Sequence, residues 1–208
     1  MRLIGVTGGV GAGKSSILEY IKKHYKCRIY LADEVAHLVK EKGENCYYRL
    51  VELLGEEVLN PENGQIDKKK MAAMIFNDDE LLEKVNAIVH PEVRIYLEKR
   101  VEEARVNSEI ELLFIEAALL IEAGYKDMVD EMWYIYATEE VRRKRLKENR
   151  GYSDEKITQI MEAQLSEEEF RLSCDFVIDN SGSLRKSYKQ IKNKLEAYTW
   201  LEGKKNRK

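Results

Sequence analysis

Residues 3–15 read LIGVTGGVGAGKS. The first part is short, mostly apolar and partly β-branched, as in a buried strand. The rest fits the spacing G-x-x-x-x-G-K-[ST], in which Gly8 and Gly13 bracket a loop and Lys14 and Ser15 follow it. Glycines let consecutive backbone N–H groups turn inward around a polyphosphate, because a Cβ would block both the dihedral angles and the close approach. The stretch therefore predicts a phosphate-binding loop after the first strand.

The residues of this loop have separate expected roles. Lys14 supplies positive charge to the β- and γ-phosphates of a nucleotide, and the Ser15 hydroxyl can complete the coordination of Mg²⁺. Apolar residues recur at helical spacing after the loop, so a helix dipole also favours the anion. The expected nucleotide contacts are Gly9, Val10, Gly11, Ala12, Gly13, Lys14, Ser15 and Ser16. A chance glycine-rich turn is the alternative, and the flanking strand and helix argue against it.

Composition limits the class of protein. With 208 residues, 44% hydrophobic and 35% charged, the chain has the balance of a soluble globular domain. A net charge of −3 removes the usual electrostatic reason to expect a nucleic-acid partner. The longest apolar stretch, 112–121, is too short for a membrane span, and no signal peptide or cysteine framework is recognisable. We expect a cytoplasmic protein that binds neither nucleic acid nor membrane, as a monomer or weak homo-oligomer.

The pattern beyond the loop predicts an α/β fold. Further strands are expected at 28–31, 109–115, 131–137 and 175–178, and helical patterns separate them. Strands that alternate with helices imply a parallel sheet covered on both faces. Helical periodicity also fills 35–54, 68–76 and 79–105, with a loop at 55–67 and with Pro91 expected to start a helix. This interval is too long for a simple crossover, so it indicates an inserted helical subdomain.

A second helical pair is expected at 142–150 and 154–164, with Ser153 as a plausible N-cap between them. These patterns divide the single domain into three parts and a tail. The core comprises 1–34, 106–138 and 170–198, the helical insertion about 35–105, the lid about 139–168, and a disordered basic tail about 200–208.

Two acids follow expected strands, where the carboxyl ends of a parallel sheet border its ligand crevice. Asp33 follows the second strand and could accept a proton from an acceptor hydroxyl, although it could equally cap the helix that comes next. Glu116 ends the third strand and is a candidate to hold Mg²⁺ through water, with a solvent-facing loop residue as the alternative.

Arginines gather on the first helix of the charged pair. They are Arg142, Arg143, Arg145 and Arg150. Such residues usually form a solvated face, and the glutamates at 139, 140 and 148 could pair with them. Phosphoryl transfer, however, needs cations over the transferring group, and Arg145 is our first choice for that role.

Taken in order, these motifs resemble the dephospho-coenzyme A kinase family over about residues 3–191. The resemblance rests on GVTGGVGAGKSS at 5–16, LADEVAH at 31–37, FNDDELLEKVNAIVHPEV at 76–93, EAALLIE at 116–122, RRKRLKENRGYS at 142–153, Gln164 and DFVIDNSG at 175–182. It implies a three-layer P-loop NTPase fold with a five-stranded parallel sheet, a helical substrate-binding insertion and a lid. It also implies ATP and Mg²⁺ as cofactors and dephospho-coenzyme A as the small-molecule substrate.

The resemblance implies roles for particular residues. Asp33 would activate the 3′-hydroxyl of the acceptor ribose, and Arg145, with Arg142 and Arg150, would belong to the closing lid. Asn180 would lie in the adenine-side loop. The residues that would bind or shape the acceptor side are Asp33, His90, Pro91, Glu116, Leu119 and Leu120.

Three positions depart from the family pattern. Leu31 replaces the first acid of D-A-D, so Asp33 is expected to act alone. Residues 118–122 read ALLIE where L-L-F-E after a proline is usual, which changes the expected pantetheine-side wall. Asn149 takes the place of the second arginine in R-L-x-x-R-x-G, and Arg150 follows it, so the sequence leaves open whether Arg150 reaches the phosphates.

Two other functions compete. Another P-loop small-molecule kinase, of the nucleoside-monophosphate or shikimate type, would lack the joint H-P, A-L-L and D-N-x-G signals. A GTPase switch would need D-x-x-G followed by N-K-x-D, whereas DNSG at 179–182 comes after the last expected strand and NKLE at 193–196 lacks the final aspartate.

Overall fold

The computed structural model describes residues 1–76, 78–106 and 110–205, with side chains up to Tyr198. The chain forms two compact units. The first, which we call the sheet unit, comprises Met1–Ile29 and Glu109–Lys208, and the second, the helical unit, comprises Tyr30–Ser108. The helical unit covers the expected insertion, and the expected lid segment 139–168 falls within the sheet unit. No helix among the described residues has both the length and the apolarity needed to cross a bilayer.

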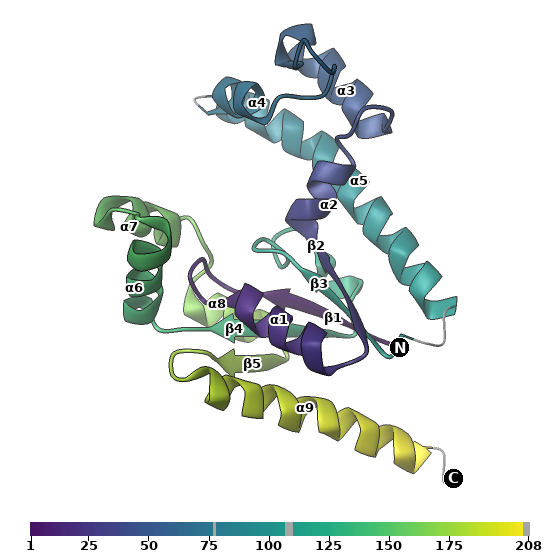
Figure 1. The fold of residues 1–208 in the computed structure, drawn as a ribbon, viewed down its shortest axis with the longest axis vertical. Helices are drawn as coiled ribbons and strands as arrows, with labels where there is room; N and C mark the ends of the chain where they lie inside the picture. Colours follow the sequence, from purple (N-terminus) through teal and green to yellow (C-terminus); the bar gives the residue numbers. More distant parts are fainter. Residues whose placement is uncertain (77, 107–109, 206–208) are drawn as a thin grey trace. The chain divides into compact units, whose positions relative to one another are not determined.

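The five-stranded parallel sheet is confirmed (Figure 1). Its strands are β1 (Arg2–Thr7), β2 (Cys27–Leu31), β3 (Leu112–Glu116), β4 (Glu131–Tyr136) and β5 (Phe176–Asp179), in the order β2-β3-β1-β4-β5. The central strand β1 pairs in parallel with β3 on one side and β4 on the other, which explains its continuous apolar run. The third strand begins at Leu112 rather than at 109, a residue outside the described ones.

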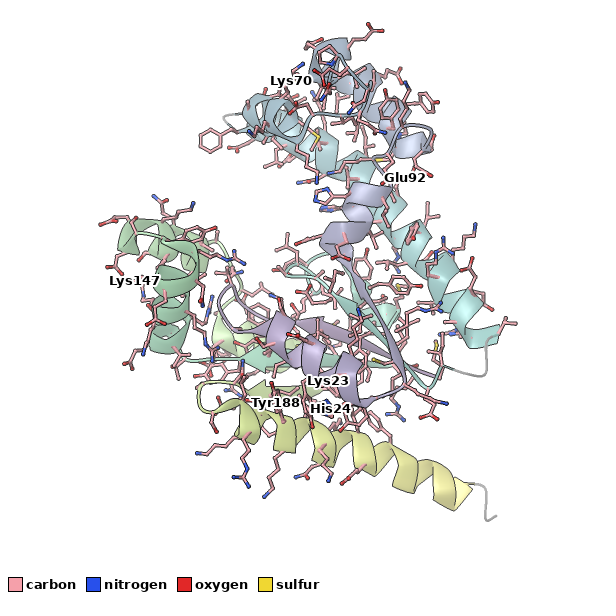
Figure 2. The ribbon with its side chains drawn as sticks, in the orientation of Figure 1. Lys23, His24, Lys70, Glu92, Lys147 and Tyr188 are labelled. Atoms are coloured by element: carbon pink, nitrogen blue, oxygen red, sulfur yellow. The ribbon has the colours of Figure 1, made fainter. Side chains whose placement is uncertain are left out.

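Helices cover both faces of this sheet. The helices of the sheet unit are α1 (Lys14–His24), α6 (Glu139–Arg150), α7 (Asp154–Glu162), α8 (Glu167–Ser173) and α9 (Leu184–Lys205), with a 3₁₀ turn, η2, at Tyr125–Asp127. Right-handed crossovers place α1 and α8 on opposite faces, because β1 to β2 and β4 to β5 run in opposite directions across the sheet. Tyr20 of α1 stacks on Tyr188 of α9 with ring centroids 3.8 Å apart, so α9 shares the face of α1 (Figure 2). The sheet unit is therefore three-layered.

Two features of these helices differ from expectation. Helix α8 lies where no separate helix is expected; the Ser166 hydroxyl accepts from the Glu169 N–H, and the Glu169 carboxylate accepts from the Ser166 N–H. This reciprocal capping box starts the helix. Helix α9 continues to Lys205, into the segment for which a disordered tail is expected, and 206–208 lie outside the described residues.

The helical unit contains α2 (Ala32–Leu38), α3 (Asn45–Leu54), a 3₁₀ turn η1 (Glu56–Val58), α4 (Lys68–Ile75) and α5 (Asp79–Val106). The periodic stretch 35–54 is thus interrupted, and Gly43 in the break has φ of +108°, a conformation that side chains disfavour. The expected loop at 55–67 also contains a bridge between Leu59 and Ile66. On α5, the Glu92 carboxylate accepts from Asn45 Nδ2 of α3 at 2.6 Å, which fastens the two helices (Figure 2).

The expectation that Pro91 starts a helix is wrong. Pro91 lies inside α5, which continues unbroken on both sides of it. Proline in a helix interior removes one backbone hydrogen bond and crowds the preceding turn. A stripe of buried residues compensates, because it packs the helix before and after the proline: Val85, Val89, Val93, Leu97 and Val101.

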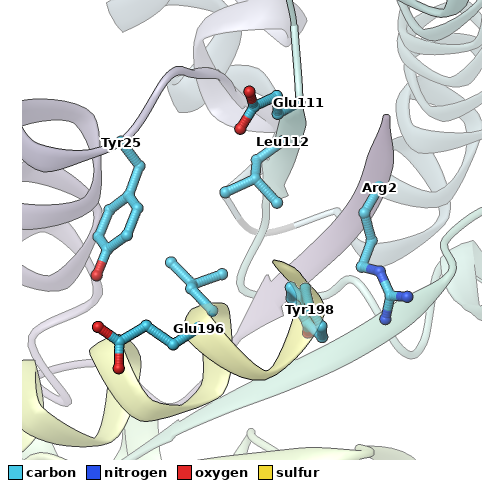
Figure 3. A pocket seen from close by; sticks show the side chains of 7 residues that line it. Arg2, Tyr25, Glu111, Leu112, Glu196 and Tyr198 are labelled. Carbon is cyan, nitrogen blue, oxygen red and sulfur yellow. The ribbon is translucent and has the colours of Figure 1, made fainter. Parts of the chain in front are cut away.

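A charged cluster anchors α9 at the amino end of the sheet. The Glu131 side chain at the start of β4 is only 8% exposed, and it pairs with Lys194 and accepts from the Tyr198 hydroxyl, both on α9. Arg2 of β1 lies 3.7 Å from the same carboxylate, with its guanidinium carbon 4.0 Å from the centre of the Tyr198 ring. We call these four residues the foot cluster. A cavity of about 120 Å³ borders it, lined in part by Tyr25, Glu111 and Glu196 (Figure 3).

Candidate active site

The phosphate-binding loop connects β1 to α1, and two of its glycines are required for different reasons. Gly13 precedes α1 with φ of +90°, and a Cβ there would lie 2.5 Å from Asn180 Nδ2. Gly9 has an ordinary backbone conformation, but a Cβ there would lie 2.5 Å from the guanidinium carbon of Arg142. Gly13 is therefore required for its backbone conformation, and Gly9 is required for the space that the Arg142 side chain occupies.

Lys14 is held at the start of α1 by two oxygens. Its ammonium donates to the Gly8 carbonyl at 2.8 Å and lies 3.5 Å from the Glu116 carboxylate at the end of β3. Both side chains are 15% exposed, so this pair is largely shielded from water. The solvent-facing alternative for Glu116 does not fit this arrangement.

The end of α1 suits an anion. The first bond within the helix runs from the Ile17 N–H to the Gly13 carbonyl, so the amides of Ser15 and Ser16 precede the hydrogen-bonded turns. Both serines are exposed, and the first turn of α1 carries no acidic side chain. These amides and the helix dipole match the charge of a phosphate group.

Two arginines of α6 hold the backbone of the loop. Arg142 donates through Nε to the Val10 carbonyl at 2.8 Å, and Arg145 donates through Nη1 to the Ala12 carbonyl at 3.0 Å. Arg145 also donates to the Asn180 carbonyl at 2.8 Å. Burial lowers the pKa of Arg142 from its ordinary value, although a guanidinium stays charged at neutral pH. The structure thus brings Arg142 and Arg145 to the phosphate loop.

The other two arginines of α6 lie elsewhere. Arg143 pairs with Glu139 at 2.7 Å and donates to Thr158 of α7 at 3.0 Å, which links α6 to α7. Arg150 is exposed at the end of α6, with its guanidinium carbon 5.9 Å from the Tyr152 ring. The structure therefore does not bring Arg150 to the loop.

Asn180 is a buried residue that fixes the loop. Its amide nitrogen donates to the Ala12 carbonyl at 2.8 Å, and its amide oxygen accepts from the Ser187 hydroxyl of α9, also at 2.8 Å. Asn180 and Ser187 are 1% and 0% exposed. The side chain of Asn180 is therefore committed to the loop and to α9. Ser187 belongs to no motif in the sequence, so sequence reasoning did not identify it.

Leu119 and Leu120 follow β3 but have different surroundings. Leu119 is 49% exposed, whereas Leu120 is fully buried and so close to β1 that a Cβ on Gly5 would lie 2.8 Å from its Cδ2. Leu120 is therefore a core residue, and of the two leucines expected to shape the acceptor side, Leu119 is the exposed one.

The remaining site candidates belong to the helical unit. Asp33 is an exposed residue in the first turn of α2, whose N-cap position is Leu31 and has no side-chain cap. The capping alternative for Asp33 therefore does not apply, although its charge suits the positive end of the helix. His90 and Pro91 are both exposed on α5.

The oxygens near the loop suit a small hard cation. Ser15 offers a hydroxyl and Glu116 a carboxylate, the ligand types that Mg²⁺ prefers. Within the described ranges, no group of three or more His, Cys, Asp or Glu side chains could enclose a metal ion. Such a site fits Mg²⁺ held mainly by phosphate oxygens and water, with one or two protein ligands.

Gln164 has no role assigned by sequence reasoning. Its amide oxygen accepts from the Val10 N–H at 3.1 Å and from Arg142 Nη2 at 2.8 Å. The only signal for it in the sequence is its place in the ordered set of family motifs, because contacts between residues 154 positions apart leave no local pattern.

The parallel sheet, its strand order, the glycine loop that leads into α1 and the lysine at its end define a P-loop kinase fold. A family model described as "Dephospho-CoA kinase" matches residues 2–186. A dephospho-CoA kinase of Aquifex aeolicus is 36% identical over 200 residues, covering 96% of this chain and 98% of that protein. One of Carboxydothermus hydrogenoformans is 34% identical, with 96% of each chain covered. The crystal structure of TT1252 from Thermus thermophilus has a TM-score of 0.77 at 31% identity and covers 94% of this chain and 97% of its own.

The chain belongs to the dephospho-CoA kinase family, whose reaction is the last step of coenzyme A synthesis.

Proposed function

We propose that this chain transfers the γ-phosphate of ATP, with Mg²⁺, to the 3′-hydroxyl of the ribose of dephospho-CoA. The products are CoA and ADP. The observation that carries this proposal is the loop itself: Lys14 lies at its end, and Arg142 and Arg145 donate to its carbonyls. We expect the protein to act in the cytoplasm as a monomer or weak homo-oligomer.

On the donor side, the residues bind and orient a polyphosphate. The amides of the loop and of the first turn of α1 would contact the phosphates of ATP, with Lys14 leaving the Gly8 carbonyl for a phosphate oxygen. Ser15 would bind Mg²⁺ directly, and Glu116 would do so through water while it also orients Lys14. When bound, Mg²⁺ supplies positive charge to the phosphate oxygens.

Arg145 would stabilise the charge on the transferring group. It is already beside the loop, and one of its guanidinium nitrogens is committed to the Asn180 carbonyl. The second, Nη1, donates only to loop carbonyls, at 3.0 and 3.4 Å, which can be exchanged for phosphate oxygens. Arg142 would contribute a second positive charge.

On the acceptor side, Asp33 would accept the proton of the ribose 3′-hydroxyl. The new bond joins O3′ to the γ-phosphorus, the bond from that phosphorus to the bridging oxygen breaks, and ADP leaves with the electron pair. Support comes from the exposed carboxylate of Asp33 after β2 and from the family's D-A-D motif. In this chain Leu31 stands at the first acid of that motif, so Asp33 is the acid that remains. His90, Pro91 and Leu119 would shape the acceptor side.

An acceptor comparison tests the reaction. Purified protein with Mg²⁺ and ATP is expected to release ADP and consume dephospho-CoA, while AMP and shikimate give no turnover above background. Turnover with AMP or shikimate but not with dephospho-CoA would contradict the proposal and favour another P-loop small-molecule kinase.

Asp33→Asn tests the proton acceptor. We expect kcat to fall about 100-fold or more, because general-base catalysis is lost, while the affinity for ATP changes little. Glu34→Gln is the matched control, because Glu34 is the neighbouring exposed acid in the first turn of α2. If Asp33→Asn keeps the wild-type kcat, Asp33 is not the base.

A further inference from the structure

Gln164 and Arg142 contact the phosphate loop at one residue, Val10. It follows α7, and its amide oxygen accepts from the Val10 N–H at 3.1 Å and from Arg142 Nη2 at 2.8 Å. Arg142 in turn donates through Nε to the Val10 carbonyl at 2.8 Å. Three hydrogen bonds therefore connect one loop residue, one residue of α6 and one residue beyond α7.

This arrangement holds Arg142 without neutralising it. The amide oxygen of Gln164 carries no formal charge, and its two donors occupy both lone pairs. Among the described residues, no carboxylate lies within ion-pair distance of Arg142, whereas the adjacent Arg143 is paired with Glu139 at 2.7 Å and with Asp154 at 3.8 Å. The positive charge of Arg142 therefore remains available beside the loop.

The space around Arg142 supports the same conclusion. Its guanidinium lies where a Cβ of residue 9 would be. Glycine is therefore needed at this position to make room for the arginine and not to allow a particular backbone conformation. A guanidinium this close to the loop, half-buried and held by neutral acceptors, is prepared for an anion in the loop.

We propose that Gln164 is a positioning residue for ATP binding, which fixes Arg142 against the loop through a neutral acceptor so that its charge acts on the nucleotide phosphates. The proposal rests on the donor half of the proposed function. It predicts that an acid of the same size would hold the arginine equally well but cancel its charge.

Gln164→Glu tests this, with ATP affinity measured by calorimetry in the absence of any acceptor. We expect the dissociation constant for ATP to rise about tenfold, because a carboxylate pairs with Arg142 and opposes the phosphates. The melting temperature of the ligand-free protein should be unchanged or higher, because the new pair is attractive. Gln159→Glu is the matched control: it makes the same change at an exposed position of α7 and should leave both quantities unchanged.

A double-mutant cycle shows whether the effect passes through Arg142. In an Arg142→Ala background, Gln164→Glu should weaken ATP binding less than twofold. Wild-type affinity in the single variant, or an equal loss in both backgrounds, would overturn the proposal, and so would a parallel fall in melting temperature and affinity.

Gln164→Leu provides the same cycle if the glutamate variant does not fold. Its loss of ATP affinity should be non-additive with that of Arg142→Ala, and additivity would overturn the proposal. Because these measurements omit dephospho-CoA, a wrong acceptor assignment would leave their results unchanged, so the two failures are distinguishable.

Discussion

The two ends of the parallel sheet hold their cations in different ways. At the carboxyl end, Arg142 and Arg145 donate to loop carbonyls and to the amide of Gln164. At the amino end, Lys194 and Arg2 of the foot cluster meet the buried carboxylate of Glu131. Neutral acceptors fix a cation without reducing its charge, whereas a carboxylate compensates it. The charges of Arg142 and Arg145 thus stay available for a ligand, whereas those of Lys194 and Arg2 are used to hold α9 on the sheet.

Arg145→Ala should have the largest effect and tests the carboxyl end. We expect kcat to fall about 1000-fold, because arginines that stabilise phosphoryl charge contribute effects of that order. The melting temperature should also fall, because the carbonyls of Ala12 and Asn180, both in buried residues, lose their donor, so the rates are compared at a temperature where both proteins are folded. Initial rates with Mg²⁺-ATP and dephospho-CoA measure this change.

The matched control is Arg143→Ala, which removes the neighbouring guanidinium paired with Glu139. It should retain kcat within about threefold, because the partners of Arg143 lie on α6 and α7 rather than in the loop. Equal losses of rate in Arg145→Ala and Arg143→Ala would contradict the claim that an arginine held by neutral acceptors contributes more to catalysis than one paired with a carboxylate.

Glu131→Ala tests the amino end and should act on stability alone. It leaves Lys194, Arg2 and the Tyr198 hydroxyl without their shared acceptor, and we expect a loss of about 3 kcal/mol in the free energy of unfolding. This is the lower end of the usual range, because both cations are partly exposed. Denaturant titration measures the loss, and a large change in kcat at permissive temperature would contradict the separation of the two ends.

Tyr198→Phe should give the smallest effect, and its pH dependence is specific. Burial, and then the hydrogen bond to Glu131, raise the pKa of Tyr198 above its ordinary value of 10.0. A raised folded-state pKa gives stability that is complete below pH 10 and is lost as pH rises further, because the unfolded chain releases its proton first.

We therefore expect wild-type unfolding free energy to fall above pH 10 more steeply than that of Tyr198→Phe, by up to about 1.4 kcal/mol per pH unit. At neutral pH the variant should lose about 1 kcal/mol. Tyr48→Phe, which removes a hydroxyl from a 59% exposed side chain, is the control. If the unfolding free energy falls equally steeply above pH 10 in wild type and in Tyr198→Phe, titration of Tyr198 is not the cause of the fall.

The parts of the fold with local signals could be predicted from the sequence. The glycine loop, the strands and the N-cap at Ser153 each follow from neighbouring residues, and the structure confirms the sheet and places Ser153 as the cap of α7. The capping box at Ser166 and Glu169 is an equally local signal for α8 and could have been found. Pro91 was misread because its local rule was overridden by burial along the whole of α5.

The candidate site was less predictable where contacts are distant. The loop motif identified Lys14 and the end of the third strand identified Glu116, and the structure pairs these two residues. Nothing local distinguishes Arg142 and Arg145 from Arg143, because the distinction lies in which partners the fold provides. Leu119 and Leu120 likewise differ only through the packing against β1.

The place of β1 in the sheet has a consequence for synthesis on the ribosome. Both neighbours of this central strand, β3 and β4, come after the whole helical unit, so β1 leaves the ribosome long before it has a partner. At about 5–20 residues per second, the nascent strand waits several seconds with its apolar side chains unpaired. The part of the enzyme that is translated first is thus completed late, and we expect nascent chains that end before residue 112 to need protection from aggregation.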